Sequence, residues 1–184
     1  MRPVIRSPLI ALCFVACATI PATARPVFLP AGVYGTYQDN GVGAVNQSAW
    51  AFSSAANTRN DPIDALRAVI AVEYLSSEVP VSPRWVKISA SVPVHLGRAR
   101  DQLRQILGIR PDAPPQLVVN ALLVVTLDLQ MGDIAAATHA LGAPVFTRPP
   151  QQTMQTLSDL PFVPEANFAT AQLQNEMLSS GFGQ

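Results

Sequence analysis

The chain has 184 residues, of which 49% are hydrophobic and only 13% are charged, and its basic and acidic side chains balance to no net charge at pH 7. This length fits a single domain with a core of ordinary size. Because the chain has neither a basic run nor a polybasic cluster, nucleic acid and anionic lipid surfaces are excluded as expected partners.

The scarcity of charge is the second compositional feature. Charged residues reach about half of their usual share of roughly 25%, and eleven arginines stand against the single lysine, Lys87. Two interpretations stay open. The surface is either neutral and polar throughout, or part of it meets another protein or an apolar ligand instead of water.

The first 24 residues have the pattern of a secretory signal peptide. Arg2 and Arg6 give a positive start, residues 9–20 form an apolar stretch, and residues 22–24 (Ala-Thr-Ala) supply the small-x-small pattern of a signal peptidase site. We therefore expect cleavage after residue 24 and a mature chain that starts at Arg25. This predicts an exported bacterial protein, located in the periplasm or outside the cell.

Cleavage would also remove the two cysteines, Cys13 and Cys17. The mature chain would then lack disulfides, thiolate metal sites and cysteine nucleophiles. Ten basic residues would remain against twelve acidic ones, a net charge of about −2. A minor alternative is a lipoprotein, in which residues 14–17 form a lipidation signal and Cys17 is retained as the anchor.

Residues 25–45 are rich in proline and glycine and are predicted to form an irregular N-terminal arm. Aromatic and aliphatic residues interspersed among these breakers indicate that the arm packs on the body of the protein. Whether the arm is ordered or swaps between subunits stays open.

Residues 46–184 are predicted to form one all-α domain of about six to seven helices. Asn46, Asp61, Ser91 and Asp133 are expected to cap helices, and Gly108 is expected to end one. Residues 84–90 are ambiguous between a helical turn and a short strand. The predicted helices span about 46–57, 62–78, 91–107, 114–130, 133–141, 150–160 and 164–181.

Two of these helices are expected to form the centre of the core. The middle of helix 62–78 is apolar nearly all round, and helix 114–130 is strongly apolar. The apolar stretch 117–129 would span roughly 20 Å, which is short of the roughly 30 Å hydrocarbon layer. We therefore expect no transmembrane segment in the mature chain.

Metal and nucleophilic chemistry find no support in the sequence. His95 and His139 are the only histidines and lack a paired spacing, so no metal site and no cofactor are expected. Both are expected to be structural, with His95 partly exposed. No Gly-x-Ser-x-Gly motif frames a serine nucleophile.

Glu73 is the weak catalytic candidate. It lies within an apolar helix, where burial would raise the pKa of its carboxyl group, as a general acid in peptidoglycan cleavage requires. Tyr74 stands where exported peptidoglycan lyases have a serine, so no family is assigned. The competing interpretations are a glutamate on a polar edge with Ser76 and Ser77, or one that is paired to an arginine.

Three residues are weak candidates for ligand binding: Trp85, Asn120 and Arg98. Trp85 lies between Arg84 and Lys87 and either stacks on a ligand or anchors a turn. Asn120 is a polar residue in an apolar helix, expected to be buried and to bond another helix or to face a pocket. Arg98 belongs to a basic helix face with Arg100 and Arg104, which is either solvated or binds an anion; Asp101 lies among them.

The leading functional hypothesis is an exported, non-enzymatic protein that binds an envelope protein or a small apolar ligand. The alternatives are a peptidoglycan-cleaving hydrolase or lyase that uses Glu73, and a structural homo-oligomeric subunit. A pocket with Glu73 at its base would favour the enzyme. A closed core around Glu73, together with an exposed apolar patch, would favour the binding protein.

Overall fold

The computed structural model describes residues 26–36 and 38–181, so the predicted signal peptide, Arg25 and Cys17 lie outside the described residues. Within these ranges the chain forms seven α-helices and two short 3-10 helices, with no strand beyond isolated bridges. The prediction of an all-α fold is confirmed. The α-helices are α1 (Asn40–Ser53), α2 (Pro62–Glu78), α3 (Ser91–Leu107), α4 (Pro115–Gln130), α5 (Ile134–Ala140), α6 (Pro150–Ser158) and α7 (Pro164–Ser179).

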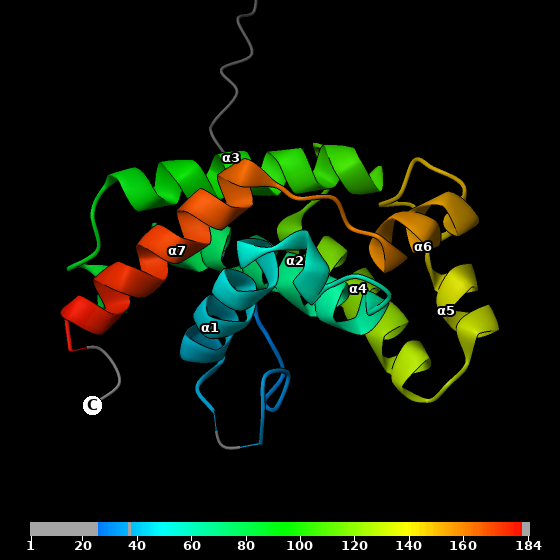
Figure 1. Ribbon diagram of the computed structural model, residues 1–184, viewed down its shortest axis with the longest axis horizontal. Helices are drawn as coiled ribbons and strands as arrows, with labels where there is room; N and C mark the ends of the chain where they lie inside the picture. The colour runs from blue at the N-terminus through cyan, green and yellow to red at the C-terminus, as the bar shows by residue number, and fades with distance from the viewer. Residues whose placement is uncertain (1–25, 37, 182–184) are drawn as a thin grey trace, which may run out of the picture.

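Helix α2 lies at the centre of the fold and packs against α1, α3, α4 and α6 (Figure 1). Every residue from Ala65 to Glu78 is buried except Arg67. The prediction that this helix forms the centre of the core is confirmed. The helix can occupy this position because its surface is apolar on nearly all sides.

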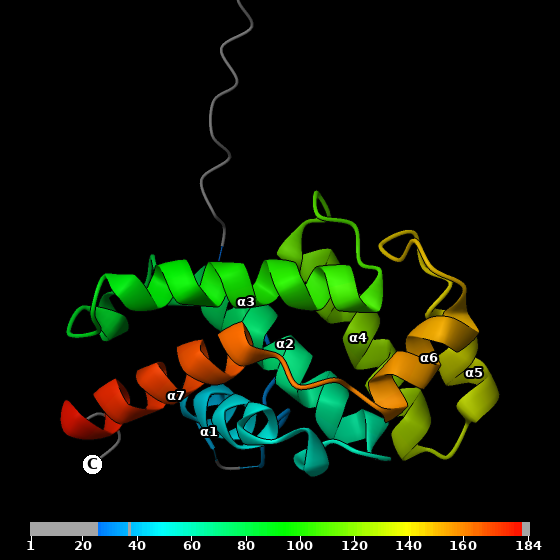
Figure 2. The same ribbon diagram turned by 45° about the horizontal axis from the view of Figure 1, so that its top comes forward.

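The other helices are arranged around α2. Helix α7 packs against both α1 and α3, and α5 and α6 lie together at one end of the molecule (Figure 2). Helix α4 packs against α2 and α5. In the part of the chain that is described, no helix combines the length and the apolar character needed to cross a membrane.

The local start and stop signals predicted several helix boundaries correctly. The side chains of Asp61 and Asp133 cap α2 and α5 by accepting backbone N–H groups. Gly108 ends α3 with a φ of 67°, and a Cβ atom there would collide with the side chain of Arg148. Both the left-handed backbone and the close approach therefore require glycine at this position.

The predicted start of the first helix at Asn46 is wrong. Helix α1 begins at Asn40, and Asp39 caps it by accepting the N–H of Val42 at 3.0 Å. The error arose because Gly43 was interpreted as a helix breaker. Gly43 is instead buried within the helix, where a Cβ atom would collide with the side chain of Tyr34.

Two further boundary predictions are settled. Ser91 does not cap α3, because it is the first residue of the helix and Ala90 occupies the cap position without a side-chain bond. The ambiguous segment 84–90 contains no strand: a 3-10 helix over Pro83–Trp85 covers its start, and irregular turns follow it.

The described part of the N-terminal arm packs on the helices, as its apolar residues predicted. Val27 and Leu29 are buried, and the Asn40 side-chain amide donates to the Leu29 carbonyl at 3.0 Å. The Gln116 side chain on α4 both donates to and accepts from the backbone of Phe28, at 3.1 and 2.7 Å. The arm backbone is thereby attached to a side chain of α4 by two hydrogen bonds.

Candidate functional site

Glu73 lies in the core and not on a surface. Its relative exposure is 1%, and Ser76 and Ser77 beside it are buried as well. The two hydroxyls donate to the Glu73 backbone carbonyl at 3.1 and 3.0 Å, so each is satisfied within its own helix. The interpretation of Glu73 as part of a polar edge is therefore wrong.

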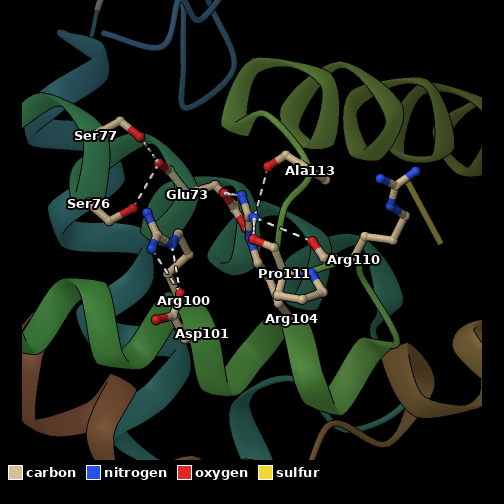
Figure 3. Close-up of polar contacts among 9 residues, drawn as sticks. All are labelled: Glu73, Ser76, Ser77, Arg100, Asp101, Arg104, Arg110, Pro111 and Ala113. Atoms are coloured by element: carbon tan, nitrogen blue, oxygen red, sulfur yellow. Dashed lines mark hydrogen bonds and ion pairs between the residues drawn. The ribbon is translucent and has the colours of Figure 1, made fainter. Parts of the chain in front are cut away.

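Arg104 on α3 is the partner of the Glu73 carboxylate (Figure 3). Its Nε donates to Oε1 at 2.6 Å, and its Nη2 donates to Oε2 at 2.7 Å. The two side chains are only 4% and 2% exposed. This is the two-point geometry in which a planar guanidinium matches a carboxylate, and it occupies both carboxylate oxygens.

The remaining guanidinium nitrogen of Arg104 holds the loop between α3 and α4. Its Nη1 donates to the carbonyl oxygens of Pro111 and Ala113 at 3.0 and 2.9 Å. Arg104 therefore joins α2, α3 and this loop through one side chain. The expectation that Arg104 lies on a basic face with Arg98 and Arg100, either solvated or anion-binding, is wrong because Arg104 is buried, whereas the arginine-paired interpretation of Glu73 is confirmed.

Two opposing effects act on the Glu73 carboxyl group. Burial raises the pKa of Glu73 above its ordinary value, while the hydrogen bonds and positive charge of Arg104 lower it. A raised pKa is what a general acid needs. The geometry is unfavourable for that role, because a proton donor must reach a substrate oxygen and both Glu73 oxygens face Arg104.

The other arginines of α3 lie outside this pair. Arg100 binds the neighbouring Asp101, with its Nη2 at 2.8 Å from the carboxylate. Arg98 is exposed and has no hydrogen bond or ion pair with any described residue. Its proposed role in anion binding stays a prediction.

Trp85 anchors a turn, which was one of its two predicted roles. It is buried within the 3-10 helix, and the Arg84 guanidinium lies 5.1 Å from the centre of its ring. Arg84 also pairs with Asp39 at 2.7 Å, which connects this turn to the start of α1. Trp85 borders a surface hollow of about 440 Å³ formed by the loop from 79 to 93.

Asn120 was predicted to be a buried amide, and this is wrong. Its side chain is exposed on α4 and accepts a hydrogen bond from Gln116 Nε2 at 2.9 Å within the same helix. The periodicity placed Asn120 on a narrow stripe, but no other helix covers that stripe. The other predicted role of Asn120, a polar group that faces a pocket, stays a prediction.

A small apolar cavity lies between the arm and the helices α2 and α4, and we refer to it as the arm cavity. Its volume is about 220 Å³. Its lining is mainly apolar and contains one charged side chain, that of Arg67. The lining residues are Pro30, Ala31, Gly32, Val33, Arg67, Ile70, Leu123, Thr126, Leu127 and Gln130.

Arg67 is the one residue of the central segment of α2 that is not buried. Its side chain is 33% exposed, and its closest acidic partner is Asp64, at 3.7 Å. Among the described residues its guanidinium donates no hydrogen bond, although it carries five N–H donors. Arg67 therefore presents unused donors at the edge of an apolar space.

Arg67 also borders a second, more polar cavity of about 260 Å³, lined by residues 32–36 and Gln47. The ring of Tyr34 lies at this boundary, and its hydroxyl donates to the Arg67 carbonyl at 3.1 Å. Burial raises the pKa of Tyr34, so this hydroxyl stays a donor at neutral pH. The two cavities meet at Arg67, one apolar and one polar.

The two histidines lie apart from these cavities. His95 is partly exposed, as predicted, and lies 2.9 Å from Glu165 and edge-on to the ring of Phe168. His139 is exposed and borders a wide hollow of about 960 Å³ between α5 and α6. In the described ranges no three His, Cys, Asp or Glu side chains gather in a way that could hold a metal ion.

Comparison with known proteins adds no assignment to this geometry. No protein-family model, no curated protein and no solved structure matches the chain.

Arg67 and the arm cavity were missed at the sequence level. Asp64 and Arg67 are three residues apart and so share one helix face, but the sequence carries no signal for what covers that face. The only available hint was the aromatic and aliphatic content of the arm, which predicted packing without a location.

Proposed function

We propose that this chain is an exported, non-enzymatic binding protein whose ligand is a small molecule with an apolar body and an anionic group. The arm cavity is its binding site. The observation that carries this proposal is the position of Arg67, a cation with unused hydrogen-bond donors at the edge of a mainly apolar cavity.

The chemistry of the lining supports this class of ligand. Ile70 of α2 and Leu123 of α4 contribute apolar side chains to the lining, and the Arg67 guanidinium offers a two-point match to a carboxylate. Ligand cavities usually combine apolar walls with a few polar groups that fix orientation. At about 220 Å³ the cavity is below the common range of about 300–1,000 Å³, which favours a short acyl chain.

The state of Glu73 supports a binding protein over a hydrolase. Its carboxylate is closed off by Arg104, and an apolar surface is exposed elsewhere, on α4. A buried, paired Glu73 together with an exposed apolar patch favours a binding protein over a peptidoglycan-cleaving enzyme. Acid catalysis by Glu73 would need the pair with Arg104 to open first.

Calorimetric titration of the purified protein with octanoate tests the proposal. We expect saturable binding of octanoate, and no measurable binding of octanol or octylammonium, because only the carboxylate satisfies Arg67. Arg67→Gln should weaken octanoate binding by about tenfold or more, since it removes a charged hydrogen-bonding partner.

Two further variants make the outcome decisive. Arg59→Gln removes an exposed arginine that lies outside the arm cavity and should bind octanoate like the wild type. Ala31→Phe enlarges a side chain on the arm wall and should abolish binding by filling the cavity. Unchanged binding in both Arg67→Gln and Ala31→Phe, or no binding of octanoate by the wild type, would overturn the proposal.

A further inference from the structure

Arg67 lies at the junction of two cavities of similar size. It lines the arm cavity of about 220 Å³ and also the second cavity of about 260 Å³, which we refer to as the polar cavity. Gly32 and Val33 of the arm line both cavities as well. An anionic group bound to Arg67 would therefore border an apolar space and a polar one. Octanoate carries its carboxylate at the end of the chain, so it would fill the arm cavity and leave the polar cavity unused.

The polar cavity offers hydrogen-bonding groups that the protein itself leaves unused. Gln47 on α1 donates from Nε2 to Asp64 Oδ1 at 3.3 Å, while its Oε1 accepts no hydrogen bond from any described residue. The Thr36 hydroxyl also lines this cavity and has no hydrogen-bond partner in the described ranges. A ligand group with both donor and acceptor atoms would pair with Gln47 and Thr36.

The charges around the polar cavity favour a neutral ligand group. Asp64 accepts the Gln47 hydrogen bond and lies 3.7 Å from Arg67, so an acidic group beside Gln47 would meet a like charge. A basic group would meet the Arg67 guanidinium, which lines the same cavity. The group that fits is polar and uncharged, such as the carboxamide of a glutamine side chain.

The arm cavity also contains one unused amide. Gln130 at the end of α4 lines this cavity, and its side chain makes no hydrogen bond with any described residue. A carboxamide donates and accepts at once, which matches the N–H and C=O groups of an amide bond in a ligand. An amide bond beside Gln130 would therefore keep its hydrogen bonds on binding, and it would not pay the cost of unpaired burial.

We infer that the ligand is an N-acylated amino acid with a neutral polar side chain. This inference rests on the proposed function, because it keeps the acyl chain in the arm cavity and the carboxylate on Arg67. In such a molecule the carboxylate is attached to the carbon atom that joins the acylated nitrogen to the side chain. The anionic group thus lies at the branch point between an apolar limb and a polar limb, as Arg67 lies between the apolar and the polar cavity.

Calorimetric titration of the purified protein with N-octanoyl-L-glutamine and N-octanoylglycine tests the inference, because these two conjugates differ only in the side-chain limb. The glutamine conjugate should bind about three- to tenfold more tightly, which is the gain expected from about one added hydrogen bond. N-octanoyl-D-glutamine should bind no more tightly than the glycine conjugate. Inversion at the branch point directs its side chain away from the polar cavity when the acyl chain and the carboxylate keep their places.

Two variants assign the contacts. Gln47→Met should bind the L-glutamine and glycine conjugates equally and should bind octanoate like the wild type. Gln130→Leu should weaken both conjugates to a similar extent, because it removes the partner of their amide bond, and should leave octanoate binding unchanged. The matched control is Gln152→Met, which changes an exposed glutamine of α6 that lines neither cavity and should keep every wild-type affinity.

The failure of this inference is distinguishable from the failure of the proposed function. Binding of octanoate together with equal affinities for the L-glutamine and glycine conjugates would overturn the N-acylated amino acid and leave the proposed function intact. So would a preference that persists in Gln47→Met, one that the D-glutamine conjugate shares, or unchanged conjugate binding in Gln130→Leu. A wild type that does not bind octanoate would overturn the proposed function and this inference with it.

Discussion

Substitution of Arg104 by methionine removes the partner of a buried carboxylate. The Glu73 side chain would keep its burial, with 2% exposure, and lose the donors at 2.6 and 2.7 Å. The Ala113 carbonyl would lose a buried donor at 2.9 Å. Methionine has a similar length and cannot replace any of these bonds.

The expected loss of stability is large. Removal of one member of a buried ion pair costs about 3–5 kcal/mol, because the other charge stays buried without a partner. The unpaired carbonyl adds about 1 kcal/mol. For a domain of this size each kcal/mol lowers Tm by about 2–4 °C, so the combined loss of about 4–6 kcal/mol in Arg104→Met should lower Tm by about 8–24 °C.

Urea denaturation followed by circular dichroism measures this loss, and a double-mutant cycle isolates its cause. The variant Glu73→Leu combined with Arg104→Met should regain most of the lost stability, because no charge stays buried. Arg100→Met is the matched control. Its pair with Asp101 lies at the surface, so we expect a cost below about 1 kcal/mol.

A loss below about 1 kcal/mol for Arg104→Met would refute this reasoning, because it would mean that water or another group reaches the Glu73 carboxylate. The Glu73→Gln variant provides a second check on its role. A folded Glu73→Gln protein that had lost a peptidoglycan-cleaving activity of the wild type would support the general acid. Full activity in this variant would exclude it.

Two further predictions concern the start of the chain. The hydrogen bond and charge of Arg84 lower the pKa of Asp39 in the folded protein. The stability that this contact contributes should therefore be complete above pH 3.8, the ordinary pKa of the carboxyl group, and it should be lost as the pH falls through the lower pKa of the folded protein. The Tm difference between wild type and Asp39→Asn should therefore vanish at acid pH. A difference that persists there would contradict stabilisation by the ionised pair of Asp39 and Arg84. The intact mass of the exported protein should correspond to a start at Arg25, whereas a lipid-modified start at Cys17 would overturn the predicted cleavage.

Local signals explain why most helix boundaries could be predicted. The cap at Asp61, the proline that follows it, and the left-handed Gly108 act within a few residues, so their effect is readable in the sequence. Gly43 shows the limit of this approach. Its meaning depends on Tyr34, which approaches it from the arm.

The candidate site is formed by contacts between segments that are distant in the sequence, and local sequence patterns do not predict such contacts. Arg104 is 31 residues from Glu73, and the helix period alone placed it on a basic face that was either solvated or anion-binding. The expectation that Asn120 is buried was wrong because periodicity gives the face of the helix on which a residue lies, but not whether another element covers that face. The arm cavity was missed for the same reason, since the arm has no period.

The most direct test of the binding proposal is an NMR measurement of where octanoate lies in the protein. We expect nuclear Overhauser contacts between the octanoate methyl group and the methyl groups of Ile70 and Leu123, together with a shift of the Arg67 Nε–H signal on binding. Contacts of octanoate with the exposed methyl groups of Leu117 or Val94, with no change at Arg67, would contradict the arm cavity as the binding site.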